Sequence, residues 1–341
     1  MSHATQHSSP KSDIDNIMAH LESRKHISPD SGFPVTLHPK FNAKIRDHVP
    51  PDPIRDPFTP PKDRAFLADK KKKALFSIAK HVDLTESIGT VLENVQLSQL
   101  SGQQLDELAL LVNERGVVFF RDQDLTTEKQ VELFEHYAPS YSLLRMEEHP
   151  DVGGDTAWVS QYGLYDALST AYRRFLDGLH AVHTSRLQYD TILDLWGVGP
   201  NRPPIDTHHP AVRTHPVTGL KALNVNPGFV TGFAELKKLE SDKLLDFLSY
   251  HIHAADDHYV RWKWAIGSVA MWDNRCSLHR VIPGTYKGAR RGIRTTVFGE
   301  KPYLDPASES RLERQTREKN EILKEGEQNN EDIGDGPKIP A

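Results

Sequence analysis

The sequence predicts a mainly β protein with covering helices, a set of elements that suits a jelly roll. Two observations favour this fold class. Short apolar or alternating runs separated by turn residues recur along the chain, and the fully apolar run Val117–Phe120 is typical of a buried strand. A few other segments repeat apolar residues at helical spacing, and they predict helices that cover the strands.

The first predicted elements lie between residues 101 and 184. Ser101-Gly102-Gln103-Gln104 has the form of a capping box, and a helical stripe follows it and stops at Gly116. The stripe consists of Leu105, Leu108, Leu111 and Val112. The next elements are predicted as a helix over about 127–137, strands at about 141–146 and 155–160, a helix marked by Leu168 to Leu179, and a strand over Ala181–Thr184.

The remaining elements lie towards the C-terminus. Ser241 is predicted to cap a helix that carries Leu244, Leu245 and Leu248. Val260, Trp262 and Trp264 alternate with charged residues, which predicts a strand with one buried face. Gly267 then turns the chain into a strand over Val269–Trp272, and a strand over Arg294–Phe298 closes the set.

Composition and charge bound the class of protein. We predict a polar, Pro-rich arm over 1–80, a folded domain over 81–305 and a polar tail over 306–341. The net charge of −5 implies no broad attraction to nucleic acid or membranes, and no apolar stretch approaches a membrane span. Cys276 is the single cysteine, which excludes an internal disulfide framework and fits a reducing compartment, so we expect a cytoplasmic protein.

The segment from Trp272 to Arg294 carries the most chemical information. His279 follows a predicted strand and can bind a metal through one ring nitrogen. Arg290 and Arg294 are four residues apart, so they share one face of the returning strand, and their guanidinium groups suit carboxylates. From spacing alone, a structural histidine and ordinary surface arginines remain the alternative.

These motifs resemble the taurine dioxygenase (TauD/TfdA-like) family of Fe(II)/2-oxoglutarate-dependent dioxygenases. The run Trp272-Asp273-Asn274-Arg275, with His279, Arg290 and Arg294 at their spacings, resembles the C-terminal signature of that family. Gly153-Gly154-Asp155-Thr156-Ala157-Trp158 and Gly116–Gln123 are similar to upstream family segments. Tyr141–Pro150 and Val225–Phe229 are similar to the fungal sulfonate-dioxygenase-like group.

The resemblance implies a double-stranded β-helix, a form of jelly roll, and an iron site with 2-oxoglutarate as cosubstrate. By the same resemblance, His279 corresponds to a metal ligand, Arg290 and Thr156 to residues that bind 2-oxoglutarate, and Arg294 to a substrate-binding residue. It implies hydroxylation of a small anionic substrate that bears a sulfonate or a carboxylate. A homo-oligomer and pairing with a paralogue both stay open.

One part of the family pattern is missing. The family's His-x-Asp pair, which would supply two further iron ligands, has no counterpart at the junction of Tyr137 and Ala138, so we expect a jelly roll that is incomplete near 137–141. Three substitute pairs were considered and are disfavoured, namely His149-Pro150-Asp151, Asp206 with His208 and His209, and Glu135 with His136. Either the chain has lost its iron site, which would make it a non-catalytic pseudoenzyme or partner protein, or an exon is missing from its gene model.

Overall fold

The computed structural model describes residues 61–137, 141–188, 204–282, 286–297 and 299–333. The chain divides into two compact units, one of Thr59–Val182 with His208–Ala341 and one of Met1–Phe58 with His183–Thr207. The larger unit contains both sheets described next. The predictions for residues 1–60, for Phe298 and for the end of the tail lie outside the described residues.

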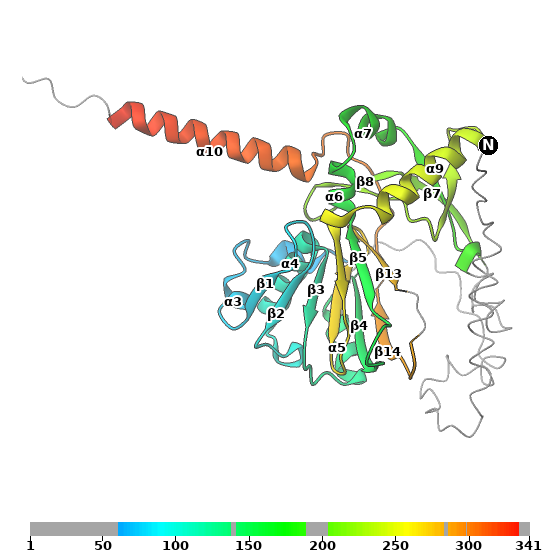
Figure 1. Ribbon diagram of the computed structural model, residues 1–341. Helices are drawn as coiled ribbons and strands as arrows, with labels where there is room; N and C mark the ends of the chain where they lie inside the picture. The colour runs from blue at the N-terminus through cyan, green and yellow to red at the C-terminus, as the bar shows by residue number, and fades with distance from the viewer. Residues whose placement is uncertain (1–60, 138–140, 189–203, 283–285, 298, 334–341) are drawn as a thin grey trace, which may run out of the picture. The chain divides into compact units, whose positions relative to one another are not determined.

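A six-stranded sheet is the largest element of the fold (Figure 1). Its strand order is β1-β2-β3-β12-β4-β14, and neighbouring strands are antiparallel except for the parallel pair β2 and β3. The strands are β1 (Lys80–Asp83), β2 (Thr90–Glu93), β3 (Val117–Phe120), β4 (Tyr141–Glu148), β12 (Val269–Asp273) and β14 (Arg291–Thr296).

A three-stranded antiparallel sheet packs against one face of the large sheet. Its order is β11-β5-β13, with β5 (Thr156–Ser160), β11 (Tyr259–Trp262) and β13 (Ser277–Val281). The apolar cluster between the sheets draws on both of them: Val117, Phe119, Met146, Ala270 and Trp272 from the large sheet, and Trp158, Val260 and Trp262 from the small one. The two sheets therefore form a sandwich, in which alternate residues of each strand face inwards.

Helices cover the other face of the large sheet. Helix α4 (Gly102–Arg115) begins at the predicted capping box and ends at Gly116, whose φ of 73° only glycine adopts readily. Helix α5 (Thr127–His136) lies beside it along this face, and both helices share an apolar cluster with Val118, Phe120 and Met271. The run Val117–Phe120 thus alternates between the two clusters, which confirms the predicted buried strand.

The remaining elements of the described residues belong to neither of these two sheets. They are η2 (Arg64–Leu67), α3 (Lys73–Phe76), η3 (Leu97–Gln99), α6 (Gln161–Asp166), α7 (Thr170–Asp177), β6 (His180–Thr184), β7 (Asp206–Pro210), β8 (Val212–Thr214), β9 (Lys221–Leu223), β10 (Val230–Phe233), α9 (Lys238–His253), η4 (Asp256–His258) and α10 (Arg311–Ile333). None of the helices in the described ranges combines the length and the apolar character that a membrane crossing needs.

Two predictions about elements are wrong in detail. Ser241 does not cap a helix, because α9 begins at Lys238 and the Ser241 hydroxyl instead accepts a hydrogen bond from the Phe233 backbone N–H. Residues 61–80 are not part of an extended arm, because Leu75 is fully buried in the core. The predicted polar tail contains a polar helix, since α10 occupies residues 311–333.

Candidate functional site

Three of the four predicted site residues lie on strands of the two sheets, and Arg290 directly precedes β14. Thr156 is buried, His279 is partly buried and Arg294 is exposed. His279 on β13 pairs with Trp158 on β5, whose side chain belongs to the cluster between the sheets. Thr156 lies two residues before Trp158 on the same strand, and Arg294 on β14 pairs with Leu144, which packs against the same cluster. Because paired residues point to the same side of a sheet, His279 and Thr156 share the face of the small sheet on which Trp158 lies.

Arg290 and Thr156 are in direct contact. The Arg290 Nη2 atom donates to the Thr156 hydroxyl oxygen at 3.2 Å, and its Nε atom donates to the Gly154 carbonyl at 2.7 Å. Gly154 has a φ of 72°, and a Cβ atom there would lie 3.0 Å from the Arg290 side chain, so only glycine fits this contact. Burial lowers the pKa of Arg290, but a guanidinium remains protonated at neutral pH.

The Thr156 hydroxyl is oriented by a second donor. The Trp264 indole N–H donates to the same oxygen at 2.9 Å. A hydroxyl has two acceptor lone pairs and one proton, so the donors from Trp264 and Arg290 leave the Thr156 proton available to an incoming acceptor. This corner of the sandwich therefore presents N–H and O–H donors together, an arrangement that suits a carboxylate.

His279 is partly buried, and its imidazole is neutral at pH 7. Burial, and then the nearby Arg294 guanidinium, lower its pKa to about 4. Its ring centroid lies 4.8 Å from that of Trp272, and no hydrogen bond joins the ring to another described residue. A neutral imidazole can accept a hydrogen bond or bind a metal ion through one nitrogen.

The described residues do not complete an iron site around His279. Fe(II) in this class of site needs two histidines and one carboxylate on one face. Arg294 is the charged group that perturbs His279, and no described carboxylate does so. Of the substitute ligands, His136 is bound to the Asp106 carboxylate at 2.8 Å, and His149 lies beside the Arg290 cation. The donor set available in the described ranges therefore does not fit iron.

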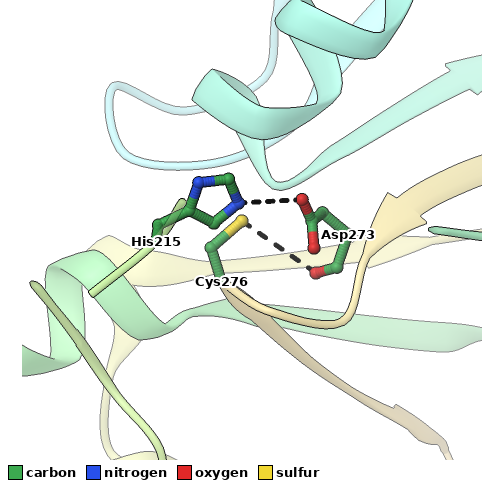
Figure 2. A group of neighbouring side chains, drawn as sticks. All are labelled: His215, Asp273 and Cys276. Atoms are coloured by element: carbon green, nitrogen blue, oxygen red, sulfur yellow. Dashed lines mark hydrogen bonds and ion pairs between the residues drawn. The ribbon is translucent and has the colours of Figure 1, made fainter. Parts of the chain in front are cut away.

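One cluster of possible metal ligands was not predicted, namely His215, Asp273 and Cys276 (Figure 2). Among the residues that the structure describes, it is the one group of three whose ligand atoms lie within 4.8 Å of one another. All three residues are buried. His279 is not a member, so this cluster does not supply the missing iron ligands.

Hydrogen bonds show that this cluster is structural. The His215 Nδ1 atom accepts the backbone N–H groups of Val217 and Thr218, both at 3.2 Å, which leaves Nε2 to donate to Asp273 at 2.9 Å. Both ring nitrogens are therefore occupied. Burial raises the pKa of the Cys276 thiol well above its usual value, which disfavours the thiolate that a metal would need.

Asp273 is held by a buried arginine rather than by a metal. The Arg275 Nε and Nη2 atoms donate to the two Asp273 carboxylate oxygens at 2.7–3.0 Å. Burial alone would raise the pKa of Asp273, but Arg275 and His215 lower it well below its usual value. Arg275 also donates to Asp63 at 2.7 Å and to Asn113 at 2.9 Å, so it joins the residue before η2 to the core. The spacing of Asp273 and Arg275 was visible in the sequence, but their partners were not.

Comparisons with known proteins identify close relatives. The family model "Taurine catabolism dioxygenase TauD, TfdA family" matches residues 133–296. A protein of Schizosaccharomyces pombe (strain 972 / ATCC 24843), whose name assigns it to the alpha-ketoglutarate-dependent sulfonate dioxygenases, is 33% identical over 311 residues, covering 74% of this chain and 78% of that protein. An alpha-ketoglutarate-dependent sulfonate dioxygenase of Saccharomyces cerevisiae (strain ATCC 204508 / S288c) is 28% identical, covering 83% and 85% of the two chains. The crystal structure of a taurine dioxygenase from Burkholderia xenovorans is similar with a TM-score of 0.58 and 28% identity, covering 68% of this chain and 95% of that chain.

The alignments with the two yeast proteins contain more positions than the number of residues of this chain that they cover. The alignment with the S. pombe protein runs over 311 residues, whereas 74% of 341 residues is about 252. Roughly 60 aligned positions of that relative therefore have no counterpart in this chain. The S. cerevisiae alignment differs in the same way, since its 350 residues cover 83% of this chain, or about 283 residues.

Proposed function

Because the chain belongs to the TauD/TfdA family of dioxygenases, which use Fe(II) and 2-oxoglutarate, we propose that the residues between its two sheets bind 2-oxoglutarate and a small anionic substrate. The observation that carries this proposal is the contact of Arg290 with Thr156 and Gly154. We propose in addition that the two sheets correspond to the two layers of the double-stranded β-helix of this family. The similarity to the taurine dioxygenase structure supports that correspondence.

The geometry at Arg290 supports an assignment to one carboxylate of 2-oxoglutarate. The bonds from Nε to the Gly154 carbonyl and from Nη2 to the Thr156 hydroxyl fix the plane of the guanidinium group, and they leave the Nη1 protons and the second Nη2 proton as the proposed donors to a ligand. The Thr156 proton adds a third donor beside them. A planar carboxylate fits this fork with two charge-assisted hydrogen bonds.

Arg294 is proposed to hold the anionic end of the substrate. It lies on the same inner face as His279 and close enough to lower the pKa of that histidine. The relatives named as sulfonate dioxygenases support a sulfonate as the anionic group, and a carboxylate would satisfy the same guanidinium. In a dioxygenase of this family, the molecule held here would be the one that is hydroxylated.

A binding experiment tests both assignments. We expect Arg290→Ala to weaken 2-oxoglutarate binding at least tenfold in calorimetry, since a charge-assisted bidentate pair contributes about 1.5–3 kcal/mol. Arg291→Ala is the matched control, because Arg291 pairs with Glu147 and Glu148 and not with the predicted site. Arg294→Ala should weaken an alkyl sulfonate such as taurine more than 2-oxoglutarate, and the reverse pattern would contradict the assignment.

The second candidate function is a non-catalytic binding protein on the same fold. It is favoured by the single iron ligand, His279, that the described residues offer. Both candidates predict anion binding at Arg290, so binding alone does not separate them. Succinate formation from 2-oxoglutarate, measured with added Fe(II) and oxygen, would support the dioxygenase and contradict the second candidate.

A further inference from the structure

The proposed site offers mainly cations and hydrogen-bond donors, whereas a metal site needs lone pairs from several side chains. Arg290 and Arg294 bring two fixed positive charges, and Thr156 and Trp264 bring further donors. His279 is the one side chain of the site that offers a metal a lone pair. A divalent cation placed at His279 would lie beside the Arg294 cation without a described carboxylate to offset the repulsion.

Strand order gives an independent observation. His279 lies on β13, the end strand of the small sheet, and Arg294 lies on β14, the end strand of the large sheet. In the part of the chain that the structure describes, no further strand pairs with the outer edge of either strand. Additional ligands for His279 would have to come from beyond these edges. The relatives have roughly 60 aligned positions that this chain lacks, and this difference leaves room for such a segment in them.

The donors that bind anions do not depend on that missing part. The Arg290 side chain is held by the Gly154 carbonyl and the Thr156 hydroxyl, and the Thr156 hydroxyl is held by Trp264. All of these residues belong to described segments of the larger unit. The anion-binding half of the site is therefore complete without a metal.

We propose that this chain is a metal-independent receptor for short acids that present one carboxylate to Arg290, and that it does not select the 2-oxo acid. The proposal rests on the proposed binding of 2-oxoglutarate and narrows its chemistry. A bound metal distinguishes 2-oxoglutarate from glutarate, because the 2-oxo acid group can chelate it and a simple carboxylate cannot do so in the same way. Arginine and threonine donors recognise the carboxylates alone, so both ligands should bind similarly.

Calorimetric titration of the full chain tests this proposal with two ligands, 2-oxoglutarate and glutarate. Each ligand is titrated in the presence of a chelator and again with Mn(II), which avoids oxidation during the measurement. The expected result is that the dissociation constants of the two ligands agree within threefold under both conditions. Arg290→Ala should weaken both ligands at least tenfold, and Arg291→Ala should leave both unchanged.

The outcomes separate this inference from the function on which it rests. If Mn(II) tightens 2-oxoglutarate tenfold or more but leaves glutarate unchanged, and His279→Ala removes that gain, the receptor is metal-dependent and the inference is overturned. If neither ligand binds under either condition, the proposed function itself fails. Circular dichroism and the melting temperature of each variant show whether a loss of binding reflects a loss of folding.

Discussion

We expect the loss of Arg275 to destabilise this fold far more than the loss of Arg291, although Arg275 takes no part in the proposed binding. Its side chain is 1% exposed and lies between two carboxylates, Asp63 and Asp273, which are 5% and 0% exposed. The Arg275→Ala change would leave both carboxylates buried without their cation. The hydrogen bond from His215 would still reach one oxygen of Asp273, but Asp63 would keep only uncharged donors.

The size of the effect follows from these contacts. Removing one partner of a buried ion pair costs about 3–5 kcal/mol, because the remaining charge stays desolvated. A loss of that size is a large fraction of the roughly 5–15 kcal/mol by which a folded domain is stable. For a domain of this size, it corresponds to a fall in melting temperature of roughly 6–20 °C.

Thermal unfolding of Arg275→Ala and Arg291→Ala, followed by circular dichroism, measures this difference. The Arg291 side chain is 35% exposed and pairs with surface glutamates, so its loss should cost less than about 1 kcal/mol. A cost below about 1 kcal/mol for Arg275→Ala as well would refute the reasoning. It would mean that the two carboxylates find water or protons after the substitution, and that the buried network is not needed for folding.

Two further predictions concern pH and the junction near Tyr137. The pKa of His279 is about 4 in the folded protein, against a usual value of 6.5, so the unfolded chain takes up its proton first as pH falls. The contribution of His279 to the free energy of unfolding is therefore fully present above pH 6.5 and should fall by about 1.4 kcal/mol per pH unit from there to pH 4. In denaturant titrations, His279→Gln should lack this pH-dependent contribution. Inserting the extra segment of a relative between Tyr137 and Ala138 should raise the melting temperature and create Mn(II) binding at His279; equal melting temperatures and no Mn(II) binding would show that the segment does not belong there.

The sequence was sufficient to predict several strands of the two sheets. Val117–Phe120 is apolar throughout because both of its faces are buried, and such a run is distinctive in a sequence. The shared face of Arg290 and Arg294 stays a prediction, because β14 begins at Arg291 and its register shifts between Arg291 and Gly292, which interrupts the two-residue repeat. The contact of Arg290 with Thr156 could be expected only from the family resemblance, since no local pattern links residues that are more than 130 positions apart.

The buried ionic network could not have been predicted from the sequence in the same way. Asp63 and Arg275 are separated by more than 200 residues, and Asp63 lies in a segment whose composition predicted an extended arm. Composition reports the average polarity of a segment, whereas the burial of Asp63 is decided by one arginine that reaches it from the far end of the chain. Ser241 failed as a cap for a related reason, because its hydroxyl had a better tertiary partner in the Phe233 N–H.

The anion-binding half of the proposed site, around Arg290, and the metal-binding half, around His279, are held in different ways. This difference explains why the first is complete and the second is not. The contacts that position Arg290 join the residue before β14 to Gly154 and to Thr156 at the start of β5, so they lie in segments that the chain retains. His279 depends on its surroundings in another way, because a metal ligand needs partners that converge on the same point from other segments. Its strand is the edge of its sheet, and the loss of a neighbouring segment would remove such partners without disturbing β13 itself. We therefore expect this chain to retain anion binding, without the preference for a 2-oxo acid that a bound metal would give.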